Sequence, residues 1–192
     1  MSTIRCGWCQ GSPLYENYHD QEWGVPVYKD QKLFEFLTLE TFQAGLSWIT
    51  VLKKREAFRK AFDDFNYQKI AYYDSQKQAE LMENPSIIRN RLKISAAITN
   101  ANAFIEIQNK YGSFSKYIWG FVNDKPLVND FKELSDIPSY TPLAVSISKS
   151  LKKNGFKFVG PTVIYAHMQA TGMVNDHLVD CFRYQEILDL KR

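Results

Sequence analysis

The chain has 192 residues, of which 45% are hydrophobic and 23% charged, and its formal net charge is +3. These values exclude a disordered chain, a collagen-like repeat and a disulfide-stapled miniprotein, and they predict one unit with a sizeable core. Three cysteines are an odd number, so metal binding or packing explains them better than disulfide bonds. Aromatic residues make up 15%, and they serve cores as well as platforms for flat ligands such as nucleobases.

Neither end of the sequence nor its interior offers a membrane segment. The first residues, MSTIRCGW, lack the apolar stretch of a signal peptide, and the long uncharged segment Phe158–Asn175 contains too many polar residues to cross a bilayer. We therefore expect a cytoplasmic protein with no membrane partner. The pI near 8.6 permits a nucleic-acid partner without establishing one.

Helical periodicity runs through nearly all of the chain. Apolar residues recur at intervals of three and four, which is the pattern of a helix buried along one face. Alternating strand patterns with tight hairpin turns are missing, so the sequence predicts an all-α fold. The expected helices start at about Asp30, run over Val51–Phe62, extend from Asn84-Pro85-Ser86 to Tyr111-Gly112, and cover Phe114–Val122, Pro142–Lys153 and Thr162–Met173.

Glu40 is an acidic residue on the apolar face of the first of these helices, seven residues after Leu33 and three after Leu37. A buried carboxylate is costly unless it is hydrogen-bonded or faces a cavity. The stretch TFQAGLSW follows directly and supplies the small and aromatic residues typical of a pocket. We interpret Glu40 either as a pocket carboxylate or as a cap on a neighbouring helix, with a raised pKa or a cationic partner.

The segment SLKKNGFKFVGPTV predicts two helices joined by a sharp turn, in a region with four lysines and no acidic residue. Gly155 follows the lysine-rich end of the first helix, and Gly160-Pro161 opens the second. Backbone N–H groups at that second start could bind a phosphate oxygen, with Lys153 and Lys157 beside it. The same spacing also fits an ordinary helix hairpin, so both interpretations stand.

Cysteine and histidine residues cluster near both ends of the sequence. His177 and Cys181 are four apart, so on a helix they would share a face and could bind one ion. Zn²⁺ prefers four nitrogen and sulfur ligands in a closed tetrahedral site. Cys6 with His19 could supply the other two, but Cys9 forms a C-x-x-C pair with Cys6, which leaves the fourth ligand open.

Long stretches of the chain resemble one known family. They are RCGW, LYENYHDQEWGVP, LFEFLTLETFQAGLSWITVLKKREAF, KYIWGFVN, LKKNGFKFVGPTVIYAHMQATGMVNDH and the late Cys181. Running almost from end to end, they are similar to the DNA-3-methyladenine glycosylase I family. The resemblance implies an all-α helix-hairpin-helix DNA glycosylase fold, with a zinc-binding lobe formed by both termini.

The same resemblance implies the organisation and the activity of the chain. Residues 1–192 would form a single glycosylase unit, with a zinc lobe from about 1–28 and 165–192 and a helical core with the hairpin at about 30–164. One structural Zn²⁺ per chain is the implied cofactor. A monomer would act on double-stranded alkylated DNA, hydrolysing the N-glycosidic bond of 3-methyladenine and leaving an abasic site, as in base excision repair.

Site residues follow from the positions that match the family's motifs. Zinc would be bound by Cys6, His19, His177 and Cys181, which leaves Cys9 as an extra thiol. Glu40 falls at the position of the base-recognising, catalytic glutamate. The implied base-binding residues are Tyr18, Trp48, Trp8 and Tyr15, and the residues that fill the gap left by the extruded base are Gln43 and Leu46.

Two departures and two competing hypotheses accompany this resemblance. The usual G-x-G hairpin tip reads Phe158-Val159-Gly160, and no aspartate general base is apparent after the hairpin, where Asp176 and Asp180 are candidates only by proximity. One alternative is a non-enzymatic, zinc-stabilised helical module that binds damaged DNA, in which Glu40 is structural. The other is a C-x-x-C oxidoreductase, which requires a thiol of depressed pKa.

Overall fold

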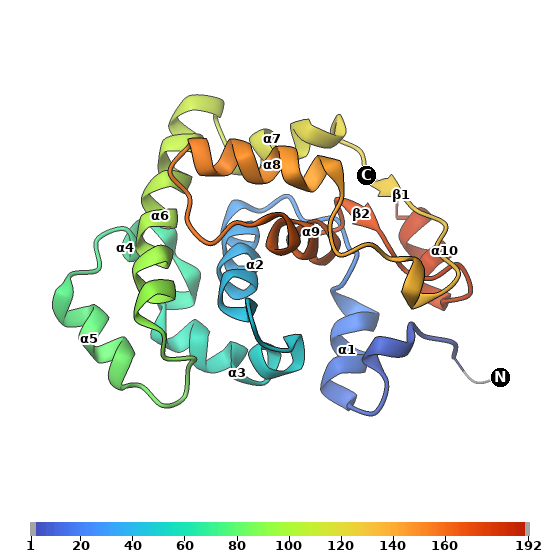
Figure 1. Ribbon diagram of the computed structural model, residues 1–192, viewed down its shortest axis with the longest axis horizontal. Coiled ribbons are helices and arrows are strands. Elements are labelled where there is room, and N and C mark those ends of the chain that lie inside the picture. The colour runs from blue at the N-terminus through green and yellow to red at the C-terminus, as the bar shows by residue number, and fades with distance from the viewer. Residues whose placement is uncertain (1–2, 191–192) are drawn as a thin grey trace.

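Helices carry most of the computed structural model, which describes residues 3–190 (Figure 1). The α-helices are α1 (Pro13–Gln21), α2 (Asp30–Gln43), α3 (Trp48–Ala61), α4 (Tyr67–Ile70), α5 (Ser75–Glu83), α6 (Arg91–Tyr111), α7 (Phe114–Trp119), α8 (Pro142–Lys153), α9 (Pro161–Ala170) and α10 (Phe182–Leu188). Short 3-10 turns are η1 (Gly7–Cys9), η2 (Asp63–Phe65), η3 (Gly120–Val122) and η4 (Leu134–Asp136). The strands β1 (Leu127–Val128) and β2 (Val174–Asn175) pair in parallel.

The strand pair departs from the predicted all-α fold. The Leu127 N–H donates to the Met173 carbonyl at 2.9 Å, and the Asn129 N–H donates to the Asn175 carbonyl at 3.2 Å. Two residues per strand are too few to produce an alternating pattern, so these strands could not be predicted from the sequence. The pair fixes the segment that follows α9, and with it the carboxyl-terminal part of the chain.

Helix α2 lies at the centre of the molecule, with α3, α6, α7 and α9 packed around it (Figure 1). The sequence predicted one buried face, but every residue from 33 to 42 is buried, including Thr38 and Thr41. A helix enclosed on all sides places its polar residues in the interior as well, so each of them needs a partner or a cavity.

Helix α6 ends where the sequence predicts but begins later. Gly112 terminates it with φ at +88°, in the left-handed region that glycine tolerates. The expected start at residues 84–86 is wrong, because the Asn84 side chain accepts the Ser86 N–H and forms a turn there. Asn90 is the N-cap instead, and its side-chain oxygen accepts the Lys93 N–H at 3.1 Å.

The amino-terminal segment of the described chain lies against the segment that leads into α10, on the side of the molecule that holds α1, α10 and β1 (Figure 1). The Phe182 N–H donates to the Ile4 carbonyl at 3.0 Å, and the Leu178 N–H contacts the Cys6 sulfur at 3.4 Å. The amino-terminal segment is therefore anchored on the carboxyl-terminal one. Among residues 3–190, no helix is long and apolar enough to cross a membrane.

Candidate active site

A cavity of about 360 Å³ opens between α1, α2, α3 and α9. Six residues singled out in the sequence line it together, namely Trp8, Tyr15, Tyr18, Glu40, Gln43 and Trp48. Five further lining residues were not predicted: Trp23, Leu134, Ile137, Ala166 and Gln169. The helices explain the convergence, because Tyr15 and Tyr18 share one face of α1, while Glu40 and Gln43 share one face of α2.

Glu40 is the acidic group of this cavity and is only 3% exposed. No hydrogen bond or ion pair from residues 3–190 reaches its carboxyl group, so the structure does not support a helix-capping role. Burial, with no cation to offset it, raises the pKa of Glu40 to about 8. A group with this pKa exchanges its proton near neutral pH, and a cationic ligand in the cavity would favour its ionised form.

Glu35 lies on the same helix and is also buried, but its surroundings are different. Arg55 donates from Nε and Arg59 from Nη2 to the Glu35 carboxylate, each at 2.8 Å, and Lys32 lies 3.0 Å from it. Burial alone would raise the pKa of Glu35, but these cations outweigh it and hold that pKa below its ordinary value. Arg55 also binds Glu22 with two hydrogen bonds of 2.8 Å, which fastens the end of α1 to α3.

Aromatic rings form the walls around Glu40. The Trp8 ring lies 4.9 Å from Tyr15 and 5.0 Å from Trp23, both in edge-on arrangements, and Tyr18 lies 5.4 Å from Trp48. The buried indole N–H of Trp48 finds no acceptor among the described residues. Walls of this kind can hold a flat, electron-poor ring through stacking and cation–π attraction.

The residues missed in the sequence reach the cavity through long-range folding. Trp23 follows α1. The triplet EWG, in which an aromatic residue stands beside a glycine, could have indicated Trp23 as a pocket residue. Gln169 projects from α9, and its amide donates to Asp176 at 2.9 Å. Leu134 and Ile137 belong to an irregular segment without periodicity, so no local pattern could assign them to a pocket.

The connection between α2 and α3, residues 44–47, is exposed. Gly45 adopts φ of +83°, which forms a tight turn that other residues rarely adopt. Leu46 at this turn is 42% exposed and lies outside the cavity lining, whereas Gln43 is part of it. Leu46 lies between two cavity residues in the sequence, Gln43 and Trp48, and its exposed side chain can contact a molecule bound outside the cavity.

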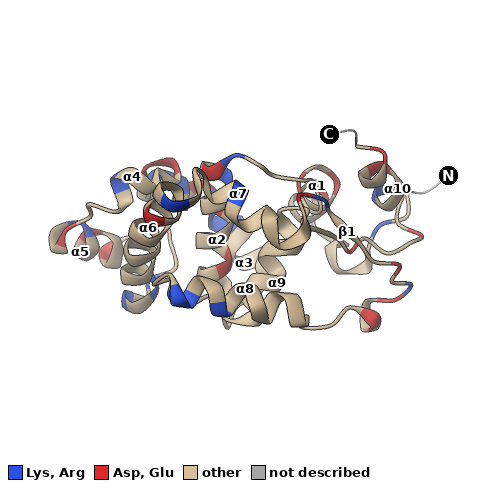
Figure 2. Ribbon diagram, turned by 90° about the horizontal axis from the view of Figure 1, so that it is seen from above, with Lys and Arg blue, Asp and Glu red and all other residues tan. Residues whose placement is uncertain are grey.

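The predicted helix hairpin is present as α8 and α9, joined by residues 154–160 (Figure 1). Gly155 adopts φ of +92° after the last residue of α8, and Gly160 is the N-cap of α9 with Pro161 next. Lys153 and Lys157 are exposed. Figure 2 shows basic residues gathered at one end of α8. Phe158 at the tip adopts φ of +55°, a conformation that a glycine would adopt more easily.

A buried group of two cysteines and two histidines lies beside the aromatic walls. Its donor atoms, one each from Cys6, His19, His177 and Cys181, lie within 4.8 Å of one another. His177 and Cys181 do not share a helix, as their spacing had suggested. They lie instead in the turn between β2 and α10, which folds both side chains inward.

The outer hydrogen bonds of this group fit a metal site. The His19 Nδ1 faces Asp20 at 2.8 Å, and the His177 Nε2 faces the Trp23 carbonyl at 3.0 Å. These contacts fix the tautomers so that His19 Nε2 and His177 Nδ1 point their lone pairs at the sulfurs, 3.4 Å and 3.6 Å from the Cys181 Sγ. Two sulfurs and two nitrogens, all buried, match the ligand preference of a closed Zn²⁺ site.

Cys9 stands apart from that group. Its thiol is buried, donates to the Cys6 carbonyl at 3.1 Å, and has a pKa raised by burial to about 11. The pKa of the Cys6 thiol is raised too, through its hydrogen bond with Cys181 and through burial. A redox C-x-x-C pair needs an accessible thiol of depressed pKa, and both thiols here are buried, so the structure does not support the oxidoreductase hypothesis.

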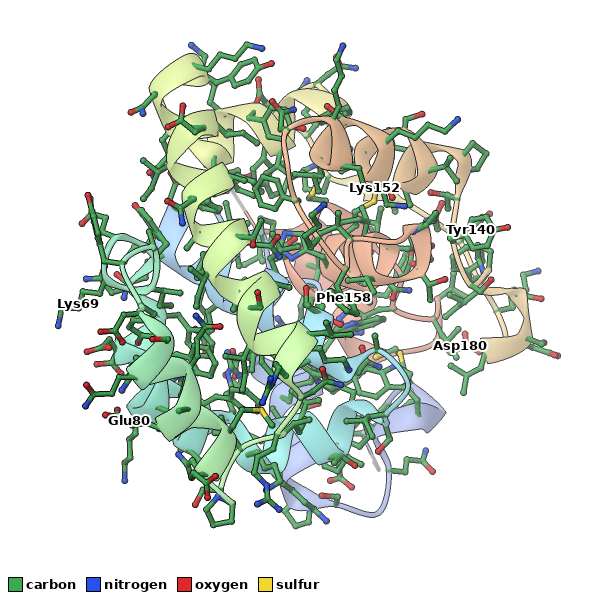
Figure 3. The ribbon with its side chains drawn as sticks, turned by 60° about the vertical axis from the view of Figure 1, so that its left-hand side comes forward. Lys69, Glu80, Tyr140, Lys152, Phe158 and Asp180 are labelled. Carbon is green, nitrogen blue, oxygen red and sulfur yellow. The ribbon has the colours of Figure 1, made fainter. Side chains whose placement is uncertain are left out.

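Neither candidate aspartate is placed as a general base. Asp176 is 1% exposed and accepts hydrogen bonds from Asn129 at 2.7 Å, Tyr165 at 2.5 Å and Gln169 at 2.9 Å. Those contacts make it an anchor between α9 and the strand pair. Asp180 is exposed at the surface and does not line the cavity (Figure 3).

One buried carboxyl group within aromatic walls, next to a basic helix hairpin, defines a helical protein with a cavity suited to a flat ligand. Comparison with known proteins gives the family. The family described as Methyladenine glycosylase matches residues 8–184. The chain belongs to this family and is an enzyme that acts on an N-glycosyl bond. Membership thus argues against the non-enzymatic module.

Individual relatives are similar over nearly their whole length. A DNA-3-methyladenine glycosylase 1 of Escherichia coli (strain K12) is 49% identical over 180 residues, 94% of this chain and 96% of the relative. A crystal structure of 3-methyladenine DNA glycosylase I superimposes with a TM-score of 0.91 at 47% identity, covering 93% and 98% of the two chains. A structure of the Staphylococcus aureus enzyme, described as the basis of its 3-methyladenine recognition, gives 0.90 at 41% identity, covering 93% and 95%.

Proposed function

We propose that this enzyme hydrolyses the N-glycosidic bond of 3-methyladenine in alkylated double-stranded DNA and leaves an abasic site. The observation that carries the proposal is the carboxyl group of Glu40, which is buried in an aromatic cavity and has no partner among residues 3–190. Two of the relatives are named for 3-methyladenine recognition or removal, which agrees with the chemistry of this cavity.

The substrate base must leave the duplex to reach Glu40. Extruding a base costs a few kcal/mol, and stacking on Tyr18 and Trp48 can return about 1–3 kcal/mol per contact. 3-Methyladenine in DNA is cationic, so aromatic faces attract it and an ionised Glu40 pairs with it. An ionised Glu40 accepts a hydrogen bond from the exocyclic amino group, which the positive ring makes a stronger donor than the amino group of normal adenine.

The bond cleavage itself needs little acid catalysis. The C1′–N9 bond breaks, its electron pair neutralises the positive ring, and the base leaves without taking up a proton. A water oxygen bonds to C1′ and loses its proton to the solvent, while the Glu40 carboxylate stabilises positive charge on the sugar. None of the residues that line the cavity is a lysine, which supports a monofunctional enzyme with no Schiff base.

Duplex binding is assigned to the exposed elements around the cavity. Leu46, with Gln43, fills the gap left by the extruded base, and the hairpin residues Lys153, Lys157 and Gly160 hold the DNA backbone. The enzyme acts as a monomer, with a helical core over about 30–164 and a lobe made of about 1–28 and 165–192.

Zn²⁺ is the metal that the Cys6, His19, His177 and Cys181 group would bind, one ion per chain. With four protein ligands it has no open position, so its contribution is structural. His19 directly follows Tyr18 on α1, and therefore binding at His19 seats Tyr18 against Trp48.

The test is release of free 3-methyladenine from methylated duplex DNA by the wild type and by Glu40→Gln. We expect the variant to stay folded and to lose at least about 100-fold in rate. Glu80→Gln, at an exposed glutamate of α5 (Figure 3), is the matched control and should retain full activity. Undiminished release by Glu40→Gln would remove Glu40 from the mechanism, and no release by a folded, zinc-loaded wild type would refute the proposed substrate.

A further inference from the structure

We propose that α6 acts as a spacer that holds two DNA-facing segments at a fixed separation, through the side chains of Lys93 and Asn100. The two segments are the α2–α3 connection, residues 44–47, and the hairpin turn, residues 154–160. This inference rests on the proposed function, because it matters only if both segments contact one duplex.

Lys93 anchors the first segment. Its Nζ donates to the Phe42 carbonyl at 2.8 Å and to the Ala44 carbonyl at 2.6 Å, where α2 ends. The residue is 6% exposed, and burial lowers the pKa of its ammonium group. A cation at the carboxyl end of a helix is favourable, because the last carbonyls have no helical partner. Residues 44–47 therefore leave α2 from a point fixed by α6.

Asn100 anchors the second segment. Its side-chain oxygen accepts the Lys157 N–H at 2.7 Å, and its amide donates to the Lys157 carbonyl at 3.1 Å, so one side chain binds both polar groups of that residue. Asn100 is 2% exposed. The next residue is Phe158, whose φ of +55° is uncommon outside glycine, and Figure 3 shows it beside α6. Ser148 of α8 holds the same turn by donating to the Val159 carbonyl at 2.6 Å.

The two anchors share one face of one helix. They are seven residues apart, which is close to two turns and about 10 Å along the axis of α6. A continuous helix of 21 residues is a stiff element, so the separation of the two segments is set by the helix itself. Gap filling by Leu46 and backbone binding by the hairpin must fit the same rigid duplex, which makes that separation part of DNA recognition.

Packing alone does not explain why a lysine and an asparagine, and not apolar residues, occupy positions 93 and 100. Burying an ammonium group and an amide costs free energy that an apolar residue would not, and the positions beside them, Ile94, Ala97 and Ala101, are apolar. Each polar group is aimed at main-chain atoms of a connecting segment and at no side chain. Directed contacts of this kind specify position more than they add stability.

The experiment separates base binding from duplex binding. Lys93→Met, Asn100→Ala and their combination are compared with the wild type for two ligands. One is free 3-methyladenine, followed by quenching of tryptophan fluorescence, and the other is a duplex with a tetrahydrofuran abasic-site analogue. Matched controls are Lys54→Met, whose ammonium group binds the Pro85 and Ser86 carbonyls, and Asn102→Ala, on the same helix.

We expect each single variant to weaken duplex binding about tenfold while the Kd for the free base changes less than twofold. The affinity of the combined variant for the duplex should be at most about threefold lower than that of either single variant. Loss of one anchor is already enough to let the separation of the two segments vary. Lys93→Arg should recover most of the affinity, and both controls should match the wild type.

Several results would overturn the proposal that α6 acts as a spacer. Equal losses for the free base and the duplex would show damage to the pocket, fully additive losses would show two independent contacts, and unchanged duplex binding would show no role. Should the first variants fail to fold, Lys93→Gln and Asn100→Ser face the same criteria. A wild type that binds neither ligand would instead refute the proposed function, which keeps the two failures apart.

Discussion

Two glutamates on α2 show how the surroundings of a residue decide its role. Glu35 and Glu40 are both buried, but Glu35 is bound by Arg55, Arg59 and Lys32, whereas no described residue binds Glu40. The cations keep Glu35 ionised and make it structural. The absence of a partner leaves the Glu40 pKa near 8 and its carboxyl group available to a ligand. An unpaired acid in a closed helix core is costly to folding, which is the expected signature of a functional group.

That cost leads to a prediction about stability and pH. Below pH 4.5 Glu40 is protonated in the folded and unfolded states alike. As the pH rises towards 8, the unfolded chain releases this proton and the folded one retains it, so wild-type stability falls over that window. Glu40→Gln should remove the effect. Thermal unfolding at pH 5 and pH 8 should show a variant that is similar at pH 5 and about 2–4 kcal/mol more stable than the wild type at pH 8.

The control for this prediction is Glu80→Gln, whose side chain is 56% exposed and whose difference from the wild type should not change with pH. A Glu40→Gln difference that stays constant from pH 5 to pH 8 would contradict the raised pKa.

The ion pairs around Glu35 give a second prediction at this scale. Arg55→Met should destabilise the protein by about 3–5 kcal/mol, because it leaves two carboxylates, Glu22 and Glu35, with one cation fewer in a buried site. Arg59→Met should cost less, because the side chain of Arg59 is 30% exposed while that of Arg55 is 6% exposed. Urea unfolding of both variants measures the order, and equal losses would contradict it.

At the scale of elements, the hairpin of α8 and α9 contrasts with the cavity. Its lysines are exposed and make no ion pair with the described residues, so their contribution is to the electrostatic part of duplex binding. We expect Lys153→Ala with Lys157→Ala to weaken binding of any duplex sequence by about the same factor. The slope of log K against log salt should fall by about 1–2, since up to two phosphate contacts are lost.

Free 3-methyladenine should still bind that variant as the wild type does, because neither lysine lines the cavity. Lys69→Ala removes a lysine of α4, away from the hairpin (Figure 3), and should leave the salt slope unchanged. An unchanged slope in the hairpin variant would place the phosphate contacts elsewhere.

Elements with a strong apolar period could be predicted from sequence, and the others could not. The helix over 142–153 and the glycine turns at its end agree with the structure, because the lysine-rich end and Gly155 are local signals. Helix α1 was missed because Tyr18 and His19 are its only buried residues, which gives no stripe to detect. Strand β1 depends on pairing with residues 47 positions away, which no local pattern records.

The candidate site divides in the same way. The burial of Glu40 followed from its helical register, and the resemblance named the aromatic companions that the structure finds around the same cavity. The partnerless state of Glu40 could not be predicted, because it depends on which side chains α1, α3 and α9 bring near it. The spacing of His177 and Cys181 suggested a helix, whereas a turn brings them together.

At the scale of the molecule, the group of Cys6, His19, His177 and Cys181 connects both ends of the chain to the cavity wall. Cys181→Ala, or removal of metal by a chelator, should lower stability by a few kcal/mol, about 10 °C in Tm for a chain of this length. Binding of 3-methyladenine should weaken with it, because α1 carries both His19 and the pocket tyrosines. Calorimetry and metal analysis on the same samples measure both effects.

Full stability and undiminished zinc content in Cys181→Ala would show that the assigned ligands are wrong. Cys9→Ala is the matched control, since its thiol lies outside the group and hydrogen-bonds only to the Cys6 carbonyl among the described residues. It should keep its metal and lose little stability.

The joining of the two ends also orders events during synthesis. Cys6 precedes His177 by 171 positions, so the group of two cysteines and two histidines can form only after residue 181 has been synthesised. A shorter nascent chain has the contacts of α1 with α3 but lacks the attachment of α1 to the carboxyl-terminal segment through His19.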